Sequence, residues 1–166
     1  CVYTCNSNSD YELQWQKALG GKYDEEARSV FQTNDGGYLV SGYSWSNTGD
    51  VSGNHGQQDF WVVKLNSAGG LLWQKSLGGR SGDIANSACQ ATDGGYVIAG
   101  VTKSNNGDVS GNHGQQDFWI VKMSAGGSLL WQKTLGGGNA DFANSVMQTS
   151  DGGYIIAGST SSNNGD

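Results

Sequence analysis

The segment ATDGGYVIAGVT at 91–102 gives the clearest indication of the fold, because it joins a tight turn to an apolar strand and recurs along the chain. Related copies read TNDGGYLVSGYS at 33–44 and TSDGGYIIAGST at 149–160, so the copies are spaced by 58 residues. Asp and Gly favour the backbone angles of a tight hairpin turn. The residues that follow are apolar or small on both faces of a strand, which predicts a strand covered on both sides.

The same period organises the chain on either side of this segment. Trp15, Trp73 and Trp131 are also 58 residues apart, and the first two copies are identical at 33 of 58 positions. A period of this length is typical of propellers, solenoids and other repeat arrays. We divide the chain into a polar N-terminal segment at 1–12, repeat 1 at 13–70, repeat 2 at 71–128 and a truncated repeat 3 at 129–166.

Each unit contains four predicted strands separated by turns rich in glycine. In the second unit they span Ala85–Ala91, Tyr96–Thr102, Phe118–Met123 and Leu129–Leu135. Four antiparallel strands per unit are typical of a β-propeller blade. We therefore predict an all-β fold of about three blades in an incomplete ring; a β-helix or stacked solenoid is the alternative. Small residues at one strand position are expected to let inner strands crowd near the propeller axis: Gly42, Gly100 and Gly158.

The repeat also resembles a known family. The pattern WQK-x-LGG, an acidic residue, A-x-S, Q-x-x-DGGY, GDVSG and D-F-W-x-V-K, from residue 13 onward, is similar to the SBBP-type β-propeller repeats of large secreted and cell-surface bacterial proteins. The resemblance implies a scaffold or binding module without shared catalytic residues. Fewer than three full units cannot close a ring of four or more blades. Further blades of the same chain, or self-association, are therefore expected to cover the open sheet edges.

Charge and cysteine content restrict the partners and the compartment. With 15 acidic and 9 basic residues the net charge is −6, and no basic cluster is present, which argues against binding nucleic acid or an anionic membrane surface. Cys1, followed by a polar run, suggests a lipid-anchored lipoprotein on the bacterial outer-membrane or extracellular surface; a local Cys1–Cys5 disulfide or an arbitrary sequence boundary are the alternatives. Cys89 stands where the other copies have Phe31 and Met147, so it is expected to be a small buried hydrophobe.

The long segment between the second and third strands of each unit is the candidate functional region. In the second unit it runs from Lys103 to Gln116, far longer than an ordinary hairpin loop. Its oxygen-bearing side chains resemble a calcium loop, although the turn glycine is displaced and the bidentate Glu is missing, so that Ca²⁺ would bind weakly. The alternative is that these side chains cap the amides of their own loop. The candidate Ca²⁺ ligands are Asp50, Ser52, Asn54 and Asp59, with Asp108, Ser110, Asn112 and Asp117.

The same loops are candidates for recognition of a glycan or a protein at the cell surface. A sugar would be held by hydrogen bonds and by stacking on exposed tryptophans. The candidate ligand-binding residues are His55, Gln57, Gln58 and Trp61, with His113, Gln115, Gln116 and Trp119. Trp45 would add a single aromatic contact, because Lys103 and Ser161 stand at its place in the other copies.

Acidic residues are expected to gather on the face where these loops open. One member of each pair follows a Gly-Gly pair by four residues and the other lies in a long loop: Glu25 with Asp50, Asp83 with Asp108, and Asp141 with Asp166. We favour capping of backbone amides as their role, over a recognition rim.

No catalytic residue is assigned, because the chain lacks the G-x-S-x-G, H-E-x-x-H, P-loop and Rossmann patterns. A carboxylate pair between units, such as Asp83 and Asp108, would be needed for the remaining enzyme alternative, a propeller hydrolase or lyase. The sequence thus favours a non-enzymatic, extracellular propeller segment that serves as a structural or protein-interaction module, with a lectin-like propeller or adhesin as the alternative.

Overall fold

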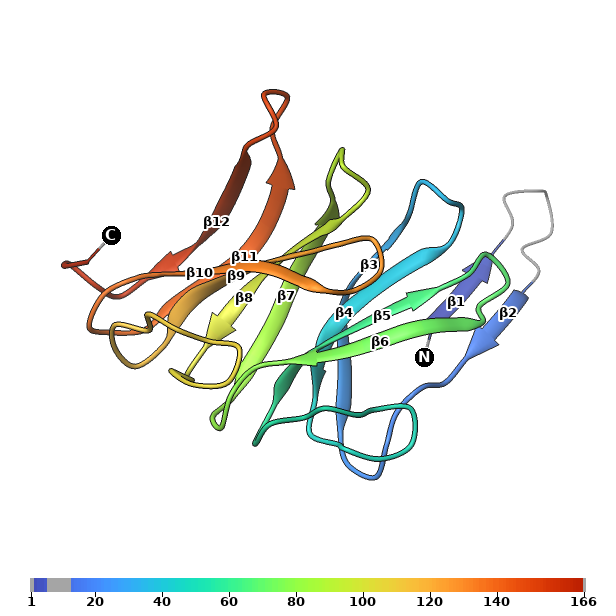
Figure 1. Cartoon of the computed structure of the whole chain (residues 1–166), viewed down its shortest axis with the longest axis horizontal. Helices are drawn as coiled ribbons and strands as arrows, with labels where there is room; N and C mark the ends of the chain where they lie inside the picture. The colour runs from blue at the N-terminus through green and yellow to red at the C-terminus, as the bar shows by residue number, and fades with distance from the viewer. Residues whose placement is uncertain (1, 6–12, 166) are drawn as a thin grey trace.

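The structure, a computed structural model, describes residues 2–5 and 13–165 (Figure 1). These residues form β-strands, turns and loops without a helix, so none of them belongs to a helix that could cross a membrane. The strands are β1 (Val2–Cys5), β2 (Leu13–Lys17), β3 (Glu25–Gln32), β4 (Tyr38–Ser44), β5 (Asp59–Leu65), β6 (Leu71–Leu77), β7 (Asp83–Gln90), β8 (Tyr96–Thr102), β9 (Asp117–Met123), β10 (Leu129–Leu135), β11 (Asp141–Gln148) and β12 (Tyr154–Thr160).

The strands form two four-stranded sheets flanked by two hairpins. Sheet 1 has the order β3-β4-β5-β6 and sheet 2 the order β7-β8-β9-β10, while β1 pairs with β2 and β11 with β12. All of these pairs are antiparallel, which confirms the prediction of an all-β fold with four-stranded antiparallel sheets. Strands β8 and β10 have the predicted bounds, whereas β7 and β9 begin earlier because Asp83 and Asp117 both pair with Thr102 of β8.

The sheets are offset from the repeats as divided in the sequence. Each sheet begins at the acidic residue after the Gly-Gly pair and ends with the WQK strand of the next copy, so sheet 1 spans 25–77 and sheet 2 spans 83–135. The N-terminal hairpin includes residues 2–5 of the segment taken as polar. The lipid-anchor and disulfide hypotheses depend on Cys1 and on the side chain of Cys5, both outside the described part of the chain.

The DGGY turn is tied to the third strand of its own sheet. Asp35 Oδ1 accepts hydrogen bonds from the Thr33 hydroxyl at 2.5 Å and from the Gly37 amide at 2.9 Å, and Gly36 has a φ of 80°. Lys64 of β5, 2% exposed, places its Nζ 3.0 Å from Asp35 Oδ1. The Thr33 bond is the main reason that the pKa of Asp35 is lowered to about 2, with smaller effects from Gly37 and Lys64. In sheet 2 Asp93 Oδ1 likewise accepts from the Gly95 amide at 2.9 Å and from Lys122 Nζ at 2.7 Å, but Ala91 stands in place of Thr33 and supplies no hydroxyl.

A β-bulge in the first strand of each unit explains why a glycine recurs at the same position of the second strand. The register shifts between Ala27 and Ser29, and a Cβ on Gly42 would lie 1.8 Å from the carbonyl oxygen of Glu26. The equivalent glycine in sheet 2, Gly100, approaches β7 in the same way. At Gly42 and Gly100 the close approach is therefore made to the neighbouring strand of the same sheet, which corrects the expectation of contacts between inner strands of different sheets. At Gly158 a Cβ would also lie 2.6 Å from Phe118 Cζ of sheet 2, so crowding between sheets is found there.

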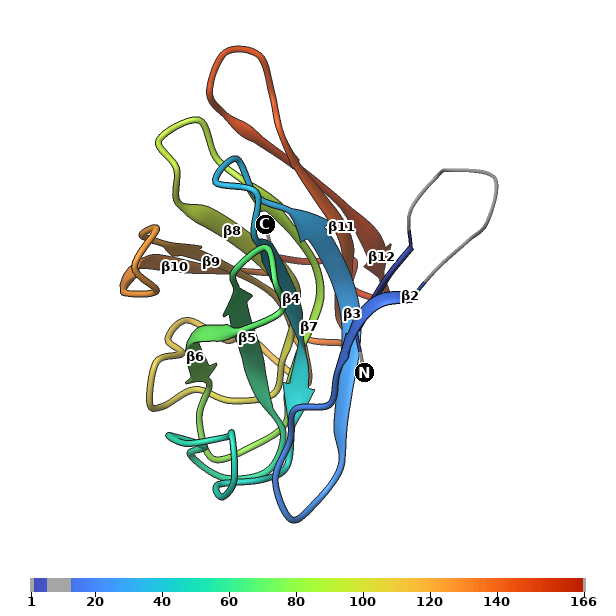
Figure 2. The ribbon, with the colours of Figure 1, turned by 90° about the vertical axis from the view of Figure 1, so that its right-hand side faces the viewer.

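The sheets and hairpins stack face to face in chain order (Figures 1 and 2). One apolar cluster lies between sheets 1 and 2 and is centred on Phe60 and Trp119, whose ring centroids are 4.4 Å apart. A second cluster joins the N-terminal hairpin to sheet 1, and a third joins sheet 2 to the C-terminal hairpin; Cys89 packs on the third but is half-buried rather than buried. A tryptophan also contacts a tyrosine of the next layer at each of three junctions: Trp15 with Tyr38, Trp73 with Tyr96, and Trp131 with Tyr154.

Polar bonds join the first strands of successive layers. Strand β3 contacts β7, and β7 contacts β11. The residues inserted at the bulges take part, because Arg28 Nη1 donates to Asn86 Oδ1 at 2.7 Å and Asn86 Nδ2 donates to the Ala143 carbonyl at 2.8 Å. The Asn34 amide donates to Gln90 Oε1 at 2.8 Å across the first junction. Both apolar burial and repeated hydrogen bonds therefore set how one layer sits on the next.

Candidate functional site

The two long loops, at 45–58 and 103–116, are held by their own polar groups. In the first, Asn47 Oδ1 accepts from the Gly53 amide and Asn54 Oδ1 from the Gly56 amide, both at 2.9 Å, while Asn54 Nδ2 donates to the Ser44 carbonyl. Val51, 1% exposed, anchors the loop in the apolar cluster of the N-terminal hairpin. The second loop repeats these bonds around Asn105 and Asn112, so both are ordered, self-capped structures.

Acidic side chains bind the Gly-Gly pair where one sheet passes into the next. Asp83 Oδ2 accepts from the Gly79 amide at 2.8 Å, and Asp108 Oδ2 accepts from the Gly78 amide at 3.2 Å. Asp83 is fully buried and also accepts from the Thr102 hydroxyl at 2.5 Å and the Ser104 hydroxyl at 2.8 Å. Burial raises the pKa of Asp83, although these hydrogen bonds oppose the rise.

The other junctions use the same capping bonds. Asp50 Oδ2 accepts from the Gly20 amide at 3.1 Å, and Glu25 Oε2 from the Gly21 amide at 2.9 Å. At the last junction Asp141 accepts from the Gly137 amide at 2.8 Å, whereas Asp166 lies outside the described residues. The acidic side chains at the first two junctions thus lie in pairs. They bind backbone amides, which agrees with the capping role favoured from the sequence.

A buried aspartate with an unused oxygen lies beneath each long loop. Asp59 Oδ2 accepts from the His55 amide at 2.9 Å and lies 2.7 Å from His55 Nδ1. Its Oδ1 is buried without a hydrogen-bond partner, and a Cβ on Gly78 would lie 2.9 Å from Oδ1 and 2.6 Å from Asp83 Oδ2. Burial is the main cause that raises the pKa of Asp59 to about 6, opposed by His55 and reinforced by Asp83. Asp117 with His113 repeats the contacts in sheet 2.

The candidate calcium ligands do not converge on one point in the structure. The Asp50 and Asp108 carboxylates bind glycine amides, the side chains of Asn54 and Asn112 cap loop amides, and those of Ser52 and Ser110 accept from glutamines at 2.7 and 2.6 Å. In the described part of the chain, no three His, Cys, Asp or Glu side chains are grouped so as to hold a metal ion. Calcium binding by these loops stays a prediction that this geometry does not support.

The candidate ligand-binding residues divide into exposed and buried groups. His55, Gln57, His113 and Gln115 are exposed, and Gln58 and Gln116 are half-buried. Trp61 and Trp119, expected to be exposed for stacking on a sugar, are buried, at 8% and 0% exposure. Their indole Nε1 atoms donate to Gln74 and Gln132, each at 2.9 Å. Both faces of each sheet are covered here, so these rings pack in the core and are not open for stacking.

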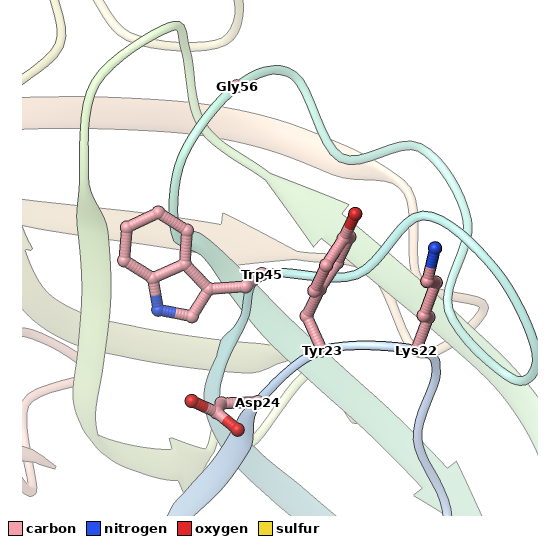
Figure 3. A pocket seen from close by; sticks show the side chains of 5 residues that line it. All are labelled: Lys22, Tyr23, Asp24, Trp45 and Gly56. Carbon is pink, nitrogen blue, oxygen red and sulfur yellow. The ribbon is translucent and has the colours of Figure 1, made fainter.

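An open cleft at the start of sheet 1 was not predicted as a site. It has a volume of about 510 Å³ and is lined by Lys22, Tyr23, Asp24, Trp45 and Gly56 (Figure 3). Tyr23 is 62% and Trp45 41% exposed, and both side chains stand beside the opening, with the Asp24 carboxylate below them in the view. Lys22 Nζ lies 5.6 Å from the centroid of the Tyr23 ring.

A break in the repeat is the sequence signal for this cleft. Lys22-Tyr23-Asp24 replaces RSG at 80–82 and GNA at 138–140, and Trp45 replaces a lysine and a serine. Sequence reasoning recognised only Trp45, because residues 22–24 lie 21 to 23 positions away along the chain. The Trp45 amide donates to the Asp24 carbonyl at 3.0 Å, which brings the two segments together.

Comparison with known proteins adds no assignment. No family model matches the chain, and no curated protein is significantly similar to it.

Proposed function

We propose that this chain is a segment of an extracellular bacterial β-propeller of the SBBP type, acting as a non-enzymatic structural and protein-interaction module. The main support for this proposal is the repeated stacking of antiparallel sheets. Equivalent tryptophan–tyrosine contacts, and contacts between first strands, recur at successive junctions. A propeller requires its first strands to lie together near an axis while the later strands diverge. The contacts of β3 with β7 and of β7 with β11 agree with this requirement.

The chemistry of the loops supports a role without catalysis. The carboxylates of Asp83 and Asp108, the example of a carboxylate pair between units named for the enzyme alternative, bind the amides of adjacent glycines. Asp83 is fully buried, and a buried carboxylate held by three donors cannot meet a substrate as a general acid or nucleophile. The loops therefore offer ordered polar surface for recognition.

Distances between spin labels would test the propeller arrangement. With the native cysteines replaced, one variant carries labels at Asn34 and Thr92, in the turns between first and second strands, and a matched variant carries them at Ser67 and Ala125, in the turns between third and fourth strands. All four positions are exposed. A propeller predicts a clearly longer distance for the second pair than for the first. Equal distances would indicate a parallel stack of sheets, as in a solenoid, and would reject the proposal.

Glycan binding is the second candidate function, and the cleft at Tyr23 and Trp45 favours it. Two exposed aromatic rings beside a carboxylate and an ammonium group provide apolar faces for a sugar ring and polar atoms for its hydroxyls. A glycan array probed with the wild type and with Trp45→Ala tests this candidate. Binding that is lost in Trp45→Ala and kept in Trp131→Ala, a control at a tryptophan of 42% exposure, would support it. Absence of binding by the wild type would reject it.

A further inference from the structure

The two terminal hairpins are complementary halves of one sheet. The repeat places β11 and β12 at the positions of β3 and β4, the first two strands of a sheet, and β2 at the position of β6, the fourth. Strand β1 then takes the position of β5. It pairs with β2 as Val2↔Lys17 and Thr4↔Trp15, and β5 pairs with β6 in the same register, Val62↔Lys75 and Lys64↔Trp73. Even the register shift after Thr4 recurs after Lys64.

Each terminal hairpin lacks the strand partner that its counterpart has. Strand β4 pairs with both β3 and β5, whereas β12 pairs with β11 alone within the described residues. Strand β5 pairs with both β4 and β6, whereas β1 pairs with β2 alone in the same part of the chain. Unpaired strand edges are ready templates for pairing with another chain.

The side chains next to these edges are apolar and exposed only at the ends of the stack. Ile155 is 56% exposed, whereas its equivalents Leu39 and Val97 are fully buried by the next layer. At the opposite end Val30 is 57% exposed, whereas its equivalent Val146 is 6% exposed against sheet 2. Each end of the stack therefore exposes an apolar side chain whose equivalents are buried between layers inside the stack.

A hydrogen bond that recurs between layers lacks one of its two partners at each end of the described stack. Gln90 Oε1 accepts from the Asn34 amide, and Gln148 Oε1 accepts from the Thr92 amide, both at 2.8 Å. The next members of this series are Gln32 at the start of the stack and the amide of Ser150 at its end. In the described structure these two groups do not have such a partner, and both residues are exposed.

We propose that, in the 166-residue chain taken by itself, β12 of one copy pairs with β1 of a second copy, and that the reciprocal pair closes a ring of two copies. The register of β4 with β5 sets Tyr154 opposite Cys5 of the second copy and Ala157 opposite Val2 of the second copy. Each copy contributes two complete sheets and half of each joined sheet, so the ring contains six sheets. Known propellers have four to eight blades, so two copies suffice where a third would exceed that range. Only the ring closure rests on the proposed propeller arrangement.

Sedimentation velocity and light scattering over a range of protein concentrations would test the proposal. The wild type is expected to have twice the chain mass of 17.4 kDa. Ile155→Lys and Val30→Lys, at opposite ends, should each raise the dimer dissociation constant at least ~10-fold, because each places an ammonium group in an apolar contact. Leu72→Lys is the matched control, at 55% exposure on the fourth strand of sheet 1, and should leave the dimer intact. Circular dichroism verifies that each variant is folded.

Hydrogen exchange locates the contact. Amides of β12 and β1 should exchange more slowly in the wild-type dimer than in the Ile155→Lys variant. A wild-type monomer at every concentration, open assemblies that grow with concentration, or a dimer insensitive to both lysine variants would each overturn the proposal. A monomer would not affect the propeller arrangement, which the spin-label distances test separately.

Discussion

Replacing Asp59 by Asn should stabilise the protein at neutral pH. The Asp59 pKa is raised to about 6 in the folded chain from an ordinary value of 3.8, mainly by burial. Because the Asp59 pKa is raised, the contribution of this group to folding stability is fully present below about pH 3.8, where the carboxyl is protonated in both the folded and the unfolded chain. It is lost as the pH rises through about 6, where the buried carboxyl ionises. Since one pKa unit corresponds to about 1.4 kcal/mol, the ionised carboxylate costs up to about 3 kcal/mol at pH 8.

The geometry explains why asparagine suits this position. Its side-chain oxygen can keep the bonds of Asp59 Oδ2 to His55, and its amide nitrogen takes the place of Oδ1, which lacks a partner next to the buried Asp83. The amide is uncharged and can donate a hydrogen bond toward the Asp83 carboxylate. For a domain of this size, about 3 kcal/mol corresponds to a rise in Tm of roughly 6 to 12 °C as an upper limit.

The assay is urea unfolding of wild type and Asp59→Asn between pH 4 and pH 8. The difference in unfolding free energy should be near zero at pH 4 and should grow through pH 6 in favour of the variant. Asp35→Asn is the matched control with the opposite sign, because the Asp35 pKa is lowered to about 2 and its contribution is present above pH 3.8. If Asp59→Asn is less stable than the wild type at pH 8, or if its effect does not change with pH, then ionisation of buried Asp59 does not destabilise the fold.

Three further predictions concern the sheets and the loops. Gly42→Ala should destabilise the fold by several kcal/mol in urea unfolding, since its Cβ would lie 1.8 Å from the Glu26 oxygen, while Gly126→Ala, whose Cβ would have only a 3.9 Å contact, should be near neutral. Phe60→Ala should cost about 3 to 5 kcal/mol because it opens a cavity against Trp119, and a loss below about 1 kcal/mol would contradict the assigned core. Addition of Ca²⁺ or of a chelator should leave the Tm unchanged, because the candidate side chains do not converge on one point and most of their oxygens already accept hydrogen bonds, Asp59 Oδ1 and Asp117 Oδ1 being the exceptions; a rise with Ca²⁺ would restore the calcium hypothesis.

The strands were predictable because local signals agree there. In 91–102 the turn residues, the apolar strand and the repeat all indicate one hairpin, and β8 has the predicted bounds. The capping role of Asp83 also followed from the sequence, since a carboxylate four residues after a Gly-Gly pair can reach the glycine amides. Short-range geometry controls both features, so one copy of the repeat is enough to predict them.

Burial between layers could not be predicted in the same way. Trp61 lies in the apolar run FWVV at 60–63, which does not by itself show whether one or both faces of the strand are covered, and in the structure stacked layers cover both faces of β5. Asp59 follows the polar run NHGQQ and looks exposed, yet it is the first residue of β5 and lies under its own loop. The Tyr23–Trp45 cleft depends on a contact between two segments that no local pattern links. These features arise from packing between elements distant in the sequence.

The bond from each glutamine to the preceding turn has a consequence for how such chains evolve. Gln90 and Gln148 make the same bond to Asn34 and Thr92, so the boundaries on the two sides of sheet 2 are built from one set of parts. Unequal crossing-over that inserts or deletes a whole 58-residue unit would recreate a fitting boundary at once, without compensating substitutions. Gain and loss of units in the gene should therefore be tolerated far more readily than insertion of a fraction of one.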